Sequence, residues 1–128
     1  MQADDAETIL VASSDTLQRS MIARYLRECG YSVIEATGFE DAKIAIAHYQ
    51  VDVVVSDAEM QDGTGFDLST LIRSMRRPIE IILTQSLVKT AQVAGDLCEQ
   101  GPLEQPYHPQ RLVDEIKRLR GARIASNN

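Results

Sequence analysis

The sequence has little positive charge. Its 13 lysine and arginine residues stand against 19 aspartate and glutamate residues, which gives a formal net charge of -6. Proteins that bind nucleic acid generally carry a basic surface, so we expect no direct nucleic-acid binding. Apolar runs are short, and none approaches the roughly 20 residues that cross a membrane. The first seven residues are polar and acidic, so they are not expected to act as a signal peptide, and we expect no membrane partner.

Cysteine is scarce as well. The chain has two cysteines, Cys29 and Cys98, which lie far apart in the sequence and match no metal-ligand spacing. Each falls on the apolar side of an expected helix. We therefore predict two buried free thiols, which are typical of a reducing compartment, and a cytoplasmic location.

The length favours one compact domain. A chain of 128 residues with 44% hydrophobic residues can bury one core and is too short for two. The apolar pattern runs from Thr8 to about residue 120, so we expect the domain over residues 8–120. Residues 1–7 are expected to be a disordered N-terminus, and residues 121–128 a flexible tail or the start of a linker.

Short apolar runs alternate with helical stripes along the chain. The runs predict strands at residues 8–12, 31–36, 51–56 and 79–84, and a short, poorly hydrophobic fifth strand around Leu103. A helical stripe follows each run. Five β-α units predict an α/β fold with a doubly wound parallel sheet and helices on both faces. The length fits a flavodoxin-like (βα)5 sheet with strand order 2-1-3-4-5.

Polar residues follow the expected strands at the edge where such sheets place their ligands. Asp57 ends the most hydrophobic run, Ser13 and Ser14 follow the first strand, Thr84 ends the fourth, and Gln105 follows the fifth. The topology predicts that these five side chains converge on one pocket.

These residues carry a resemblance to a known family. The chain between Thr8 and Leu119 resembles the receiver domain of two-component response regulators. In that resemblance Asp57 stands at the phosphoacceptor aspartate and Thr84 at the switch threonine. Pro106 stands at the proline that follows the family's lysine, and its preceding peptide bond is expected to be cis.

The same resemblance shows what the site has lost. The two adjacent acids that hold Mg²⁺ in the family correspond to Ser13 and Ser14, and the lysine corresponds to Gln105. Hydroxyls are weak ligands for a hard dication, and glutamine brings no charge to a phosphoryl group. The aromatic switch position falls near Gly101 or Pro102. We therefore expect an atypical, degenerate receiver that signals by protein–protein interaction with little or no phosphorylation, and no cofactor.

Two alternatives stay open. The first is a working phosphoacceptor modified on Asp57, with a rebuilt Mg²⁺ site made of Asp15, Asp57 and Glu59. The second is a flavodoxin-like enzyme or nucleotide binder. The glycine-free turn from Ala12 to Asp15 and the lack of a nucleophile–histidine–acid pattern argue against it, so we predict that the protein is not an enzyme.

The resemblance also implies partners. A histidine kinase, an effector domain or a second receiver would bind the face made by the fourth helix, fifth strand and fifth helix, about residues 87–120. The same face would support a homodimer.

Overall fold

A four-stranded parallel sheet forms the centre of the protein. The computed structural model describes the backbone of residues 7–127 and the side chains of residues 7–121. The strands are β1 (Thr8–Ala12), β2 (Ser32–Ala36), β3 (Val53–Asp57) and β6 (Glu80–Thr84), in the order β2-β1-β3-β6. The α/β class and the order of the first four strands are confirmed. Of the disordered N-terminus expected over residues 1–7, residues 1–6 lie outside the described residues.

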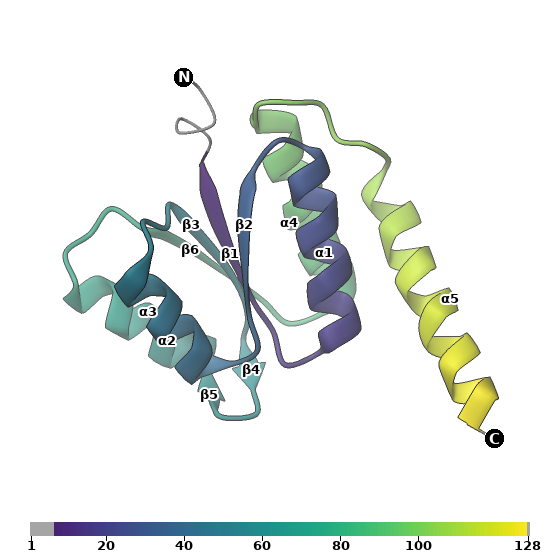
Figure 1. The fold of residues 1–128 in the computed structure, drawn as a ribbon, viewed down its shortest axis with the longest axis horizontal. Helices are drawn as coiled ribbons and strands as arrows, with labels where there is room; N and C mark the ends of the chain where they lie inside the picture. The colour runs from purple at the N-terminus through teal and green to yellow at the C-terminus, as the bar shows by residue number, and fades with distance from the viewer. Residues whose placement is uncertain (1–6, 128) are drawn as a thin grey trace.

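Helices cover both faces of this sheet (Figure 1). The helices α1 (Thr16–Glu28) and α4 (Leu87–Gln100) lie on one face, and α2 (Phe39–His48) and α3 (Gly65–Ser74) lie on the other. Successive side chains of a strand point to opposite faces of the sheet, so β3 contributes side chains to the hydrophobic core on each face. Val53 and Val55 belong to the α1–α4 core and Val54 to the α2–α3 core, which explains the unbroken apolar run in the sequence.

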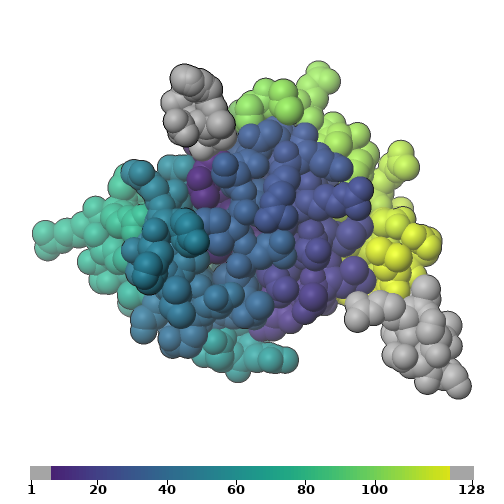
Figure 2. Space-filling view, viewed as in Figure 1, coloured from purple at the N-terminus to yellow at the C-terminus, as the bar shows by residue number. Residues whose placement is uncertain are grey.

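The last helix forms a separate layer. Helix α5 (Pro109–Asn127) packs against α1 and α4 through Leu112, Val113 and Ile116, all of which are buried. In Figures 1 and 2 it lies beyond α1, on the flank of the molecule. The helix continues well past residue 120, where we expected a flexible tail to begin. Between residues 7 and 127 no helix has the length and apolarity needed to span a membrane.

A small antiparallel hairpin follows β3. Its strands are β4 (Glu59–Met60) and β5 (Gly63–Thr64), and its turn brings Asp62 to the start of α2. The Asp62 carboxylate accepts hydrogen bonds from the N–H groups of Phe39, at 2.7 Å, and Glu40, at 3.0 Å. These bonds hold the pKa of Asp62 below its ordinary value. A residue more than 20 positions away thus caps the helix.

The expected fifth strand does not form, and the prediction of five strands in the sheet was wrong. Residues 101–107 are a loop that crosses the end of α1, where the N–H of Leu103 donates to the carbonyl of Cys29 at 3.1 Å. Pro102 and Pro106 have no N–H to offer a strand ladder. Because this loop leaves the sheet, the face expected around a fifth strand has no strand at its centre.

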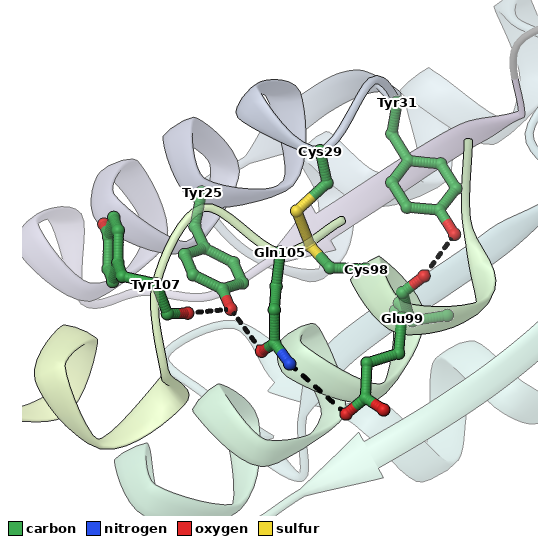
Figure 3. The surroundings of a disulfide bond; sticks show 8 residues. Tyr25, Cys29, Tyr31, Cys98, Glu99, Gln105 and Tyr107 are labelled. Carbon is green, nitrogen blue, oxygen red and sulfur yellow. Dashed lines mark hydrogen bonds between the residues drawn. A yellow bond between two sulfur atoms is a disulfide. The ribbon is translucent and has the colours of Figure 1, made fainter. Parts of the chain in front are cut away.

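The cysteines are joined, so the prediction of free thiols was wrong. Cys29, at the end of α1, forms a disulfide with Cys98 in α4, with a Cα–Cα distance of 5.4 Å and a sequence separation of 69 (Figure 3). Both residues are fully buried. The sequence places them far apart, and only the packing of α4 on α1 brings them together. One argument for a reducing compartment is thereby removed.

Candidate functional site

Three strand ends meet at the pocket that contains Asp57. Asp57 ends β3 and pairs in register with Thr84 at the end of β6, while Ser13 directly follows β1. The pocket has a volume of about 470 Å³. It is lined by Gln18, Asp57, Ala58, Glu59, Thr84, Gln85, Ser86 and Leu87. Asp57 and Thr84 therefore line one pocket, and Ser13 lies next to it through its hydrogen bond to Asp57.

Hydrogen bonds from neutral side chains hold the Asp57 carboxylate. Ser13 Oγ donates to Asp57 Oδ2 at 2.7 Å, and Gln18 Nε2 donates to Oδ1 at 3.4 Å. Burial raises the pKa of Asp57, the bonds from Ser13 and Gln18 lower it, and the nearby charge of Asp15 raises it, with a net rise above the ordinary value of 3.8. Hydroxyl and amide dipoles thus surround Asp57, and no cation partner of Asp57 lies within residues 7–121.

Ser13 is locked in place. Its side chain is buried, its hydroxyl accepts from the N–H of Asp15 at 3.1 Å, and its carbonyl accepts from Arg19 Nη1 at 2.9 Å. The hydroxyl therefore both donates and accepts. Ser14 has another role, since its Oγ accepts from the N–H of Gln61 at 3.0 Å and ties the first loop to the hairpin. Ser14 is not among the groups that bond to Asp57.

The side chain of Asp15 is already used. Asp15 caps α1 by accepting from the N–H of Gln18 at 2.9 Å, and it forms an ion pair with Arg120 of α5. Glu59 lines the pocket but is exposed. Within residues 7–121 no three histidine, cysteine, aspartate or glutamate side chains are close enough to hold a metal ion. The residues present do not fit the Mg²⁺ site that the family implies, and the set Asp15, Asp57 and Glu59 is not assembled as one.

Thr84 is directed toward α4. Its Oγ1 lies 2.7 Å from Oγ1 of Thr90, and both residues are buried. Thr90 gives its own proton to the carbonyl of Ser86, at 2.8 Å. Since a hydroxyl has one proton to donate, Thr84 is the donor in the pair. The hydroxyl proton of Thr84 is therefore committed to the first turn of α4.

Gln105 lies outside the pocket, contrary to the prediction. Its Oε1 is 2.9 Å from the hydroxyl of Tyr25, and its Nε2 donates to Glu99 at 3.3 Å (Figure 3). The absence of the fifth strand explains this position, because no strand carries Gln105 to the sheet edge. The cis peptide bond predicted before Pro106 was also wrong, since all peptide bonds between residues 7 and 127 are trans.

Gln18 is a site residue that the sequence reading did not identify. It lies one turn after the cap of α1, so its side chain points back to the strand ends and reaches Asp57. Its position three residues after Asp15, on the first turn, was the available signal. Glutamine is also common on exposed helix faces, so the residue type alone did not distinguish it.

A family model described as the response regulator receiver domain matches residues 9–117. The chain is 29% identical over 116 residues to the DNA-binding transcriptional regulator NtrC of Azospirillum brasilense, across 88% of this chain and 24% of that protein. It is 28% identical over 114 residues to the transcriptional regulatory protein PdtaR of Mycobacterium tuberculosis, across 85% and 54% of the two chains. The chain therefore spans about half the length, or less, of these relatives.

Solved structures give the same fold. A response regulator receiver domain protein from Methanospirillum hungatei superposes with a TM-score of 0.61 at 21% identity, over 89% of this chain and 93% of that one. The chemotaxis protein CheY4 of Vibrio cholerae superposes with a TM-score of 0.59 at 23% identity, over 88% and 98%. At these identities the similarity shows the fold alone.

Proposed function

The chain belongs to the response regulator receiver domain family, and on that premise we propose that it is an atypical receiver that signals through protein–protein contacts, with little or no phosphorylation of Asp57. The observation that carries the proposal is the 2.7 Å hydrogen bond from Ser13 to Asp57. The resemblance makes Ser13 the counterpart of a metal-binding acid of the family, and this bond supports the proposal because its donor is a neutral hydroxyl. In this proposal the protein is a signalling module and not an enzyme, and it needs no cofactor.

The chemistry of phosphoryl transfer supports this proposal. Transfer to a carboxylate depends on positioning and on neutralising the charge of the incoming group. Two unit charges about 4 Å apart interact by about 4 kcal/mol at an effective dielectric constant of about 20. Ser13 and Ser14 bring none of this charge. Gln105 is neutral and lies outside the pocket. Asp57 is left as a nucleophile without electrostatic support.

The competing hypothesis is a working phosphoacceptor. Asp57 and Glu59 line the same pocket, which is the observation in its favour. Both hypotheses are tested by intact-mass measurement after incubation with acetyl phosphate and Mg²⁺, with Asp57→Ala as the matched control. We expect no phosphoryl adduct on the folded parent protein. An adduct that the parent acquires and Asp57→Ala lacks would overturn the proposal.

The partners follow from the family. We propose a histidine kinase, an effector domain or a second receiver as the partner, and the cytoplasm as the location. Receiver-like segments occur in proteins named as a DNA-binding transcriptional regulator and as the autoinducer 1 sensor kinase/phosphatase LuxN of Vibrio harveyi, the latter 26% identical over 105 residues. These names cover both output and input proteins, which supports a partner on either side of a signalling step.

A further inference from the structure

The outer edge of β6 carries no strand. Within residues 7–127, β6 pairs with β3 alone and ends the sheet on that side. The segment expected to cover this edge instead crosses the end of α1, where Leu103 bonds to Cys29. The disulfide between Cys29 and Cys98 joins α4 to that same helix end. The edge of β6 is therefore left open to another chain.

The backbone of β6 has free hydrogen-bonding groups on this edge. The N–H of Glu80 donates to Asp52 at 3.1 Å, and the carbonyl of Thr84 accepts from Ala58 at 2.8 Å, so both residues face β3. Residues of a strand alternate in the direction of these groups. The N–H and C=O groups of Ile81 and Leu83 consequently point outward. Backbone groups of this kind require partners, either water or a second strand.

The side chains of β6 favour pairing. Ile81, Ile82 and Leu83 are each partly exposed, and Glu80 is exposed. Soluble proteins commonly protect an open edge with lysine, proline or a bulge. The segment Glu80–Thr84 contains no lysine or proline, and its register with β3 has no bulge.

We propose that β6 pairs antiparallel with β6 of a second copy of this chain, about a two-fold axis at Ile82. In that register Ile81 lies opposite Leu83 of the second copy, and each such pair exchanges two backbone hydrogen bonds. Ile82 lies opposite its own counterpart, and Glu80 lies opposite Thr84. Within the two paired strands, no two residues of like charge lie directly opposite each other. The strand is thus self-complementary, as a closed two-fold interface requires.

Charge at the two ends of the strand supports the same partner. Arg76 precedes β6 and is exposed, whereas the other end of the strand lies beside Asp57 and Glu59. Antiparallel pairing brings the basic end of one copy toward the acidic end of the other. This inference rests on the proposed function as an interaction module, and it identifies the partner as a second copy and the surface as the edge of β6.

Cross-linking tests the register directly. At the two-fold axis the Ile82 pair is not hydrogen-bonded, so its Cα atoms would lie about 4.5 Å apart, within the roughly 4.4–6.8 Å range of a disulfide. Under mild oxidation Ile82→Cys should form a covalent dimer, and Glu80→Cys, although more exposed, should not. Peptide mass mapping separates this bond from the native disulfide. No cross-link in Ile82→Cys, or preferential cross-linking of Glu80→Cys, would overturn the proposal.

Sedimentation provides the second test. Ile81→Pro removes an outward N–H, whereas Ile81→Ala truncates the side chain further but keeps that N–H. Circular dichroism establishes that both variants fold. Since two symmetric hydrogen bonds are lost, we expect the dissociation constant of Ile81→Pro to exceed that of Ile81→Ala by about tenfold or more. Equal constants, or a parent protein that stays monomeric in the millimolar range, would overturn the proposal.

Hydrogen exchange shows whether the chain covers its own edge. In dilute monomer we expect fast exchange of the amide hydrogens of Ile81 and Leu83 and slower exchange of that of Ile82. Slow exchange of all three would overturn the proposal, because it would mean that another segment of the same chain pairs with β6. The acetyl phosphate assay measures phosphorylation of Asp57 and does not depend on dimerisation. Failure of this inference is therefore distinguishable from failure of the proposed function.

Discussion

Breaking the disulfide between Cys29 and Cys98 should strongly destabilise the protein. The bond closes a loop with a sequence separation of 69. The chain-entropy relation for a loop of this size gives about 4 kcal/mol of stabilisation at 25 °C. For a domain of intermediate size this corresponds to a fall in melting temperature of roughly 15 °C.

Reduction isolates the effect of the bond. Both cysteines are fully buried, and reduction removes no heavy atom from the core. Urea denaturation with and without a phosphine reductant should give free energies of unfolding that differ by about 4 kcal/mol. The double variant Cys29→Ala, Cys98→Ala is the control, because its unfolding should be unaffected by reductant.

Two results would refute this reasoning. Coincident denaturation curves, in samples whose unfolded chains titrate as fully reduced, would refute the calculation from loop entropy. If protein unfolded without reductant titrates with two free thiols, the disulfide does not form, and the free thiols predicted from the sequence would be correct.

Three further predictions concern single contacts. Burial raises the folded-state pKa of Asp57 above 3.8, so its ionisation costs stability as pH rises past that value. Asp57→Asn should therefore be more stable than the parent at neutral pH, with an advantage that fades below about pH 4 in urea unfolding. Tyr25→Phe should lower the free energy of unfolding, measured in urea, by about 1–2 kcal/mol, because the Tyr25 hydroxyl lies 2.6 Å from the carbonyl of Tyr107. Tyr107→Phe should lower it less, because the Tyr107 hydroxyl has no hydrogen bond within residues 7–121. Replacing Ser13 and Ser14 together by aspartate should create Mg²⁺ binding measurable by calorimetry, which the parent should lack. A variant that binds no Mg²⁺ would contradict the correspondence of these two residues to the family's metal-binding acids.

The strand-end site was largely predictable from the sequence. An unbroken apolar run that ends in Asp57 identifies a central parallel strand and its carboxyl end. In a parallel sheet every carboxyl end faces the same edge, so Ser13 and Thr84 follow from the order of the elements. The bonds that Asp57 makes did not follow. They depend on side-chain directions on the first turn of α1, which the order of elements does not specify.

Gln105 shows where the prediction failed. Its expected place assumed that five β-α units give five paired strands. The segment around Leu103 has two prolines and one strongly apolar residue, so its own preference for a strand is weak. Contacts with α1 then decide its path, and they carry Gln105 to Tyr25 and away from Asp57.

The sequence by itself determined the class of fold, the order of four strands and the place of Asp57 at the carboxyl end of a central strand, because each depends on local periodicity or on residue type. Tertiary structure alone decided the rest. The disulfide, the open edge of β6 and the cap that Asp62 provides for α2 all join segments far apart in the chain. Local patterns carry no information about which distant segments pack together, since that choice is made by the whole core at once.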